Sequence, residues 1–146
     1  GSLNGDGDIR FTITINPAAL PSVSIAVNPA AVDEDGAANL TYTVTRSLNL
    51  ASATSVNINT AGTATPGSDY TGGVATVVIP TNATTATITI DPNADSTVEP
   101  DETVILAVAA GSGYTVAAAP SNSATGTIRN DDVSLPTLTL TKVSNG

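Results

Sequence analysis

The segment ATITIDPNADSTVEPDETVILAV, residues 86–108, contains two runs in which side chains of different polarity alternate, ATITI and TVILAV, joined by an acidic stretch. An alternation with period two predicts β-strands, because successive side chains of a strand point to opposite faces of a sheet. The joining stretch is rich in Pro, Asn and Asp, which are typical of connections between strands. The segment therefore predicts two strands with a carboxylate-rich connection.

The same alternation recurs along the chain, and no stretch has the 3.6-residue period of an amphipathic helix. Each run is bounded by Gly, Pro, Asn or Asp. Seven such runs predict an all-β fold, an immunoglobulin-like antiparallel β-sandwich of about seven strands, although the Cys and Trp of true immunoglobulin domains are absent. The predicted strands are residues 22–27, 40–45, 55–60, 74–79, 85–90, 103–108 and 124–128.

One face of each predicted strand is apolar and supplies the expected core, while Thr occupies the opposite face. The predicted core residues are Val23, Ile25, Val27, Leu40, Tyr42, Val44, Val56, Ile58, Ala86, Ile88, Ile90, Val104, Leu106, Val108 and Ile128.

The composition excludes several classes of function. The chain has 146 residues, which is enough for one domain, and it has neither Cys nor His. Their absence excludes disulfides, thiol catalysis, Ser-His pairs and the usual zinc ligands. The net charge of -9 argues against nucleic acid and anionic membrane surfaces as partners. No apolar run approaches the roughly 18 residues of a membrane helix, so we expect no direct membrane insertion.

The flanks resemble parts of the central unit. LPSVSIAV begins at Leu20 and LPTLTLTK begins at Leu135, and the same offset places FTITI, residues 11–15, over GTIRN, residues 126–130. This predicts a tandem array. Residues 1–19 then form a flank that ends a preceding repeat, residues 20–134 form the sandwich, and residues 135–146 begin the next repeat.

The acidic residues lie mainly at the ends of predicted strands, in the runs DEDG (33–36), GSDY (67–70), DSTVEPDE (95–102) and NDD (130–132). In a sandwich such connections collect at the two ends, so several carboxylates are expected at one end. A cluster of carboxylates requires a counter-charge. Calcium accepts 6 to 8 oxygen ligands in loose geometry, whereas magnesium demands a strict octahedron and zinc or copper favours softer ligands. Carboxylates in turns are also commonly just solvated, and the spacing alone leaves both interpretations open.

GTATPGSDYT (62–71), the segment 86–108 and ATGTIRNDD (124–132) together resemble the Calx-β family, the calcium-binding sandwich of sodium/calcium exchangers that also recurs in bacterial surface proteins. The resemblance implies a calcium site with a backbone carbonyl near Thr97 as an additional donor. Ala94 and Asn130 replace acidic residues of the family pattern, so one to three calcium ions are expected. The carboxylate ligands implied by the resemblance are Glu34, Asp69, Asp95, Glu99, Glu102, Asp131 and Asp132.

These observations predict a calcium-binding structural repeat of an extracellular or cell-surface bacterial protein, with neighbouring repeats as its partners. Calcium would clamp one end of the sandwich and stiffen the array. A regulatory calcium sensor and an adhesin module that binds a ligand through loops or Thr faces remain open alternatives. We expect no enzyme: Glu99 and Glu102 could in principle form a glycosidase pair, but there is no Trp or His to accompany them.

Overall fold

The computed structural model describes residues 2–3, 9–10, 13 and 19–142. Within these residues there are twelve strands. Strands β1 (Ser2–Leu3) and β2 (Ile9–Arg10) pair with each other. The predicted flank strand at residues 11–15 lies outside the described residues except for Ile13.

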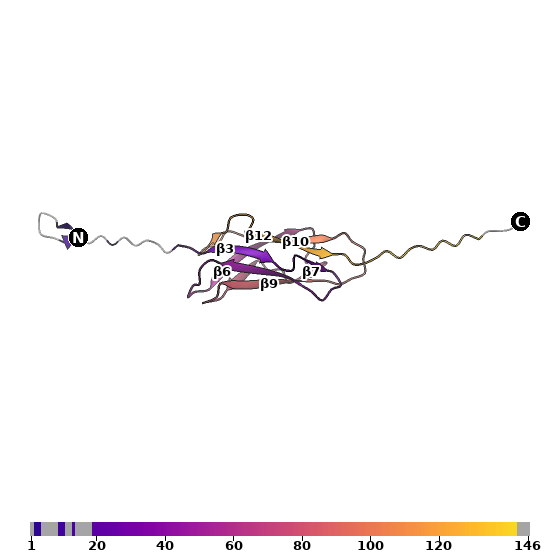
Figure 1. Ribbon diagram of the computed structural model, residues 1–146, viewed down its shortest axis with the longest axis horizontal. Helices are drawn as coiled ribbons and strands as arrows, with labels where there is room; N and C mark the ends of the chain where they lie inside the picture. The colour runs from indigo at the N-terminus through magenta and orange to yellow at the C-terminus, as the bar shows by residue number, and fades with distance from the viewer. Residues whose placement is uncertain (1, 4–8, 11–12, 14–18, 143–146) are drawn as a thin grey trace.

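The other ten strands form two five-stranded sheets that pack face to face (Figure 1). The first sheet has the order β11 (Thr115–Val116), β3 (Ser22–Val27), β5 (Leu40–Arg46), β9 (Thr85–Pro92) and β7 (Tyr70–Thr71). The second has the order β4 (Ala31–Asp33), β12 (Ser123–Arg129), β10 (Glu102–Val108), β6 (Thr54–Gly62) and β8 (Thr76–Ile79). The predicted all-β sandwich is confirmed.

All seven predicted strands are present, and their ends differ from the prediction by at most two residues. The predicted strand count was too low, because β4, β7 and β11 were missed. Each of these has only two or three residues, too few to carry an alternating pattern. The longer strands pair antiparallel as predicted, and two short strands add parallel pairs: β11 with β3, and β4 with β12.

The core lies between the two sheets and matches the predicted set closely. All predicted core residues are buried except Val27 and Ala86, which are partly buried and pack against the core. The prediction omitted five buried residues that lie on missed strands, in connections or at the end of β8: Val32, Ala64, Tyr70, Ile79 and Tyr114.

Arg46, at the end of β5, is 1% exposed. Its guanidinium donates hydrogen bonds to oxygens of the two connections around it, at 2.7–3.2 Å. These bonds join the connection of residues 47–53 to that of residues 80–84. We call this end of the sandwich the Arg46 end. The acceptors are the carbonyls of Leu50, Ser52, Pro80 and Ala83 and the hydroxyl of Thr54.

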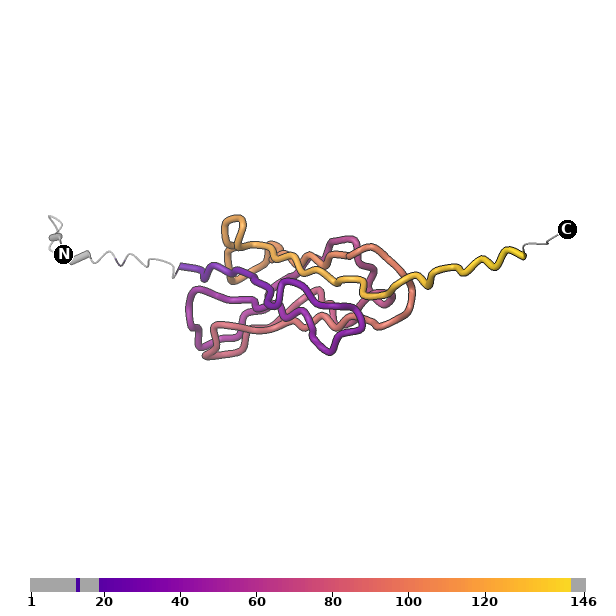
Figure 2. Tube along the Cα trace, turned by 45° about the vertical axis from the view of Figure 1, so that its right-hand side comes forward, coloured from indigo at the N-terminus to yellow at the C-terminus, as the bar shows by residue number. Residues whose placement is uncertain are grey.

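The sandwich begins and ends at opposite ends of its long axis (Figure 1). β3 begins at the Arg46 end, where the Ser47 amide donates to the Ser22 carbonyl at 2.8 Å. β12 ends at the other end, beside the end of β4. Beyond it, residues 133–142 extend away from the sandwich without forming a strand (Figure 2). The described residues contain no helix of the length and apolarity needed to cross a membrane.

Candidate metal centre

Two short strands bring the acidic runs together at the end of the sandwich opposite Arg46, which we call the acidic end. β4 runs parallel to β12 with Asp33 beside Arg129, so the residues that follow both strands emerge together. The Glu34 amide donates to the Arg129 carbonyl at 2.9 Å, and the Asp35 amide donates to Oδ1 of Asp131 at 3.3 Å. The run that follows β12 therefore lies against the run that follows β4.

β7 positions Asp69 in the same way. Tyr70 of β7 pairs with Pro92 at the end of β9, so Asp69 lies beside the start of the connection between β9 and β10. The Asn93 amide donates to the Asp69 carbonyl at 2.9 Å, and the Asn93 side chain donates to the Ser68 carbonyl at 2.7 Å. These bonds hold the Asp69 backbone against the acidic connection.

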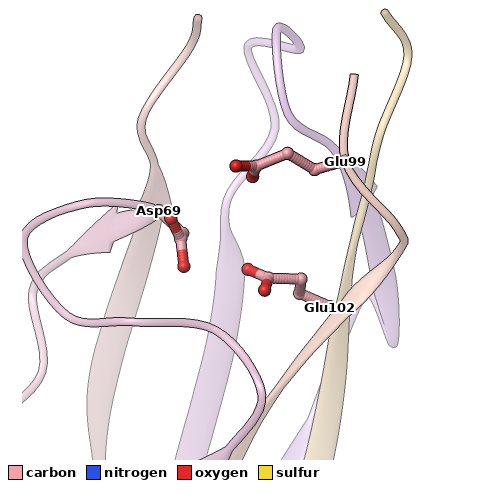
Figure 3. A group of neighbouring side chains, drawn as sticks. All are labelled: Asp69, Glu99 and Glu102. Atoms are coloured by element: carbon pink, nitrogen blue, oxygen red, sulfur yellow. The ribbon is translucent and has the colours of Figure 1, made fainter. Parts of the chain in front are cut away.

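Three of the predicted ligands form a compact group that we call the carboxylate triad: Asp69, Glu99 and Glu102. They come from the connection before β7, the connection before β10 and the first residue of β10. Their side chains point toward one another (Figure 3), and one carboxylate oxygen of each lies within 4.8 Å of the others. At this separation two carboxylates repel by about 1 kcal/mol in water and about 3 to 4 kcal/mol at an effective dielectric constant of 20.

The pKa values of the triad reflect this crowding. Partial burial, a hydrogen bond with Asp69 and the charges of Asp69 and Glu99 raise the pKa of Glu102 to about 7. The Thr65 amide donates to the Asp69 carboxylate and lowers the pKa of Asp69. Near neutral pH Asp69 is therefore ionised, while Glu102 holds a proton for part of the time.

Glu34 and Asp132, whose charges interact, are called the second group, and Glu34 also interacts with both glutamates of the triad. Glu34 is 6% exposed, and burial together with the charges of Asp95 and Asp132 raises its pKa. Loss of water contact and the charge of Asp35 raise the pKa of Asp132. Oδ2 of Asp132 is shielded from solvent and has no hydrogen-bond partner among the described residues. A shielded carboxylate oxygen without a partner is costly, so this atom is available to accept a ligand.

The remaining predicted ligands have other contacts. Oδ1 of Asp95 accepts a hydrogen bond from the Thr97 amide at 2.6 Å, which fixes the turn that contains both residues. Asp131 is exposed and uses Oδ1 to accept from the Asp35 amide. Thr97 is exposed and contributes its amide to this turn. The role of a carbonyl near it as a calcium donor stays a prediction.

Two residues of the acidic end were absent from the predicted ligand set although they lie inside the quoted acidic runs. Asn130 accepts a hydrogen bond from the Glu99 amide at 3.1 Å and donates to the Asp132 carbonyl at 3.0 Å. Asp101 accepts from the Asn130 amide at 3.1 Å. The position of Asn130 directly after a strand and before two aspartates was the only sequence signal, because two of its partners, Glu99 and Asp101, are about 30 residues away in the chain.

The donor set fits a calcium ion by its chemistry and its spacing. All of the candidate ligand atoms are oxygens, which hard cations prefer. An ion with ligands at 2.3 to 2.6 Å separates oxygens on its opposite sides by about 4.6 to 5.2 Å, and the triad oxygens lie within 4.8 Å. The partnerless Oδ2 of Asp132 is a further acceptor at the acidic end.

A cavity of about 610 Å³ lies elsewhere, between β6 and residues 66–75. Its described lining includes Asn59, Thr60, Tyr70 and Val74 but no Asp, Glu, Lys or Arg.

The fold and the acidic end define a class: a two-sheet β-sandwich with an oxygen-donor cluster at one end. The Calx-beta domain family matches residues 18–132, and the chain therefore belongs to this family. This agrees with the resemblance recognised in the sequence.

Solved structures support the same assignment. The apo form of the Calx CBD1 domain is 24% identical with a TM-score of 0.61, and the match covers 78% of this chain and all of that chain. CBD12 of CALX1.2 is 26% identical with a TM-score of 0.59, over 75% of this chain and 44% of that chain. The calcium binding domain CBD12 of CALX1.1 is 25% identical with a TM-score of 0.59, over 74% of this chain and 44% of that chain. A search of curated proteins found no match.

Proposed function

We propose that this chain is a calcium-binding module and not an enzyme, with its calcium site at the acidic end. The observation that carries the proposal is the carboxylate triad, and the partnerless Oδ2 of Asp132 at the same end of the sandwich supports it. Like charges gathered at this spacing are stabilised by a divalent cation and destabilised without one. Membership of the Calx-β family, and the calcium-binding relative among the solved structures, support the same conclusion.

Each of the two groups of carboxylates would bind its own calcium ion. Asp69, Glu99 and Glu102 would hold one ion between the connection before β7 and the start of β10. Glu34 and Asp132 would hold another, with Asp95 close enough to affect the charge of Glu34. Glu34 follows the second strand of the sandwich and Asp132 follows the last one, so calcium would join distant parts of the chain without a disulfide. One to three ions remain the expected complement.

The test is a calcium titration by calorimetry on the chain, with thermal melts in calcium and in chelator. We expect saturable binding and a rise in Tm, because a ligand that binds only the folded state stabilises it in proportion to the logarithm of its concentration. The double variant Glu99→Gln, Glu102→Gln removes two charges with little change in shape and should abolish most of the binding. Asp91→Asn is the control for lost charge, because Asp91 is an exposed carboxylate of β9 outside both groups.

Two results would contradict the proposal: no heat of binding, or a variant without the two glutamates that binds as well as the parent chain. The affinity also separates the two calcium-dependent roles. Millimolar affinity suits a structural module in extracellular calcium, and micromolar affinity suits a sensor.

We further propose that the module is one repeat of a tandem array in an extracellular or cell-surface bacterial protein, with neighbouring repeats as its partners. Exposed flanks support this. By the repeat offset, Leu138 and Leu140 align with Val23 and Ile25, which are buried in the core. Leu138 and Leu140 themselves are 86% and 87% exposed. Ile13, which aligns with buried Ile128, is 82% exposed. Side chains that lack a core here would be covered by a neighbouring repeat.

A further inference from the structure

Asn130 is the one uncharged residue that bridges both groups of proposed ligands within the described acidic end. It follows β12 directly and is half-buried. Its side-chain carbonyl accepts from the Glu99 amide at 3.1 Å, and its side-chain amide donates to the Asp132 carbonyl at 3.0 Å. Glu99 belongs to the triad and Asp132 to the second group, so this side chain fixes the backbone of one relative to the other.

The chemistry of these two bonds requires an amide. A carboxylate could accept from the Glu99 amide but could not donate to the Asp132 carbonyl, because an ionised carboxylate only accepts. A carboxylate at this position would also add a negative charge between Glu99, Asp101 and Asp132. Asn130 therefore fixes the backbones of Glu99 and Asp132 relative to each other without adding a negative charge. An added charge would increase the repulsion that already raises the pKa of nearby carboxyls.

The backbone of Asn130 adds a third bond. Its amide donates to Oδ1 of Asp101 at 3.1 Å, which ties the strand exit to the end of the acidic connection. Two of the three bonds of this residue thus span about 30 positions and cross from the end of β12 to the segment before β10, while the third reaches Asp132, two residues further along. Hydrogen bonds that hold the backbone behind metal ligands determine where the ligands point.

From this geometry we infer that Asn130 is a positioning residue that holds the two ligand groups in register when no calcium is bound. The inference rests on the proposed calcium site. It adds that this acidic end is pre-arranged by an amide, and that the same neutral amide keeps its calcium affinity below what a carboxylate there would give.

Two substitutions separate these two effects. Asn130→Ala removes both side-chain bonds and adds no charge, so Tm in chelator should fall by about 5 °C and calcium affinity should weaken about tenfold. Asn130→Asp keeps the acceptor, loses the donor and adds charge. Its Tm in chelator should fall at least as far, while its calcium affinity should exceed that of the parent chain, because affinity rises with ligand charge.

Asn49→Asp is the matched control. It makes the same chemical change at an exposed position after β5, at the Arg46 end, and should leave both Tm in chelator and the calcium isotherm unchanged. A residue with a merely structural role would lower Tm in both Asn130 variants but would not move their calcium affinities in opposite directions.

The inference is tested by thermal melts in chelator and calcium calorimetry of the parent chain, Asn130→Ala, Asn130→Asp and Asn49→Asp. The inference is overturned if both Asn130 variants melt like the parent chain in chelator, or if both shift calcium affinity in the same direction. A parent chain that binds no calcium would instead defeat the proposed function, and the chelator melts would still test whether Asn130 holds the acidic end.

Discussion

The hydroxyl of Tyr42, on the first sheet, donates a 2.7 Å hydrogen bond to the carbonyl of Val104, on the second sheet. The same oxygen accepts from the Gly126 amide at 3.1 Å, and burial raises the pKa of Tyr42 to about 12, so the phenol stays neutral. A Cβ at position 126 would lie 2.6 Å from this oxygen. One buried hydroxyl therefore connects three strands across the core.

Tyr42→Phe should destabilise the protein by about 1 to 3 kcal/mol, because it removes two buried hydrogen bonds. Urea unfolding measures this as a lower midpoint with an unchanged slope. Thr87→Val, on the exposed face of β9, is the control and should stay within about 0.5 kcal/mol of the parent chain. Equal midpoints for Tyr42→Phe and the parent chain would refute the bridging role.

Arg46→Lys should be among the most damaging single substitutions at the Arg46 end. A lysine retains the charge, but its single ammonium cannot reach all five oxygens, so several carbonyls lose their partner. Each buried carbonyl left without a partner costs up to about 3 kcal/mol of stability. Hydrogen exchange should accelerate in residues 47–53 and 80–84, and the urea midpoint should fall. Arg129→Lys provides the comparison, since its ion pair with Asp33 is exposed and contributes little. Similar losses in both variants would contradict the assignment.

Stability without calcium should decrease as pH rises through about 7. The pKa of Glu102 is raised from 4.5 to about 7 in the fold, so the stability contributed by its protonated form is present below pH 4.5 and lost as pH passes 7. Asp69 has a lowered pKa and acts in the opposite direction, but only near or below its ordinary value of 3.8. Melts in chelator between pH 5.5 and 8 should therefore show Tm falling.

Calcium competes with the same proton, so the rise in Tm on adding calcium should be larger at pH 8 than at pH 5.5. In Glu102→Gln the amide imitates the protonated acid, and the pH dependence in chelator should flatten. A Tm that increases with pH in chelator, or a slope that survives this substitution, would show that Glu102 does not control it.

Residues 137–142 should be able to act as a first strand. The test is a fusion in which residues 1–142 are followed directly by a second copy that starts at residue 28. In this fusion TLTLTK, residues 137–142 of the first copy, takes the place of SVSIAV, residues 22–27 of the second. We expect two folded units and slow hydrogen exchange around Leu138 and Leu140, because both enter a core. The version with Leu138→Asn and Leu140→Asn should lose the second unit and keep the first. Failure of the unmodified second unit to fold would argue against the array.

The strands and core were predictable because the long strands carry a full alternating pattern, as in Leu40 to Arg46. Short β4, β7 and β11 were not, because their pairing depends on where the neighbouring connections return. The burial of Arg46 was also unpredictable: its partners are mainly backbone carbonyls, which leave no mark in the sequence.

The acidic end was predictable in position but not in its internal arrangement. The acidic runs around Asp69 and Glu102 predicted carboxylates at strand ends, and the structure brings these two residues together with Glu99. Which carboxylates share a proton, which oxygen of Asp132 lacks a partner, and what Asn130 connects depend on sub-ångström placement of side chains. Only the folded arrangement of β4 beside β12 and β7 beside β9 determines these contacts.

The placement of the first and last strands also sets how the module bears mechanical tension. β3 begins at one end of the long axis and β12 finishes at the other (Figure 1). Each has an antiparallel ladder on one side, with β5 and β10 respectively, and a short parallel ladder on the other. A pull on the two ends of the sandwich runs along these strands, at right angles to their ladder hydrogen bonds. The bonds of each ladder are therefore loaded in shear and resist together, whereas a hairpin pulled open at one end would lose them one at a time.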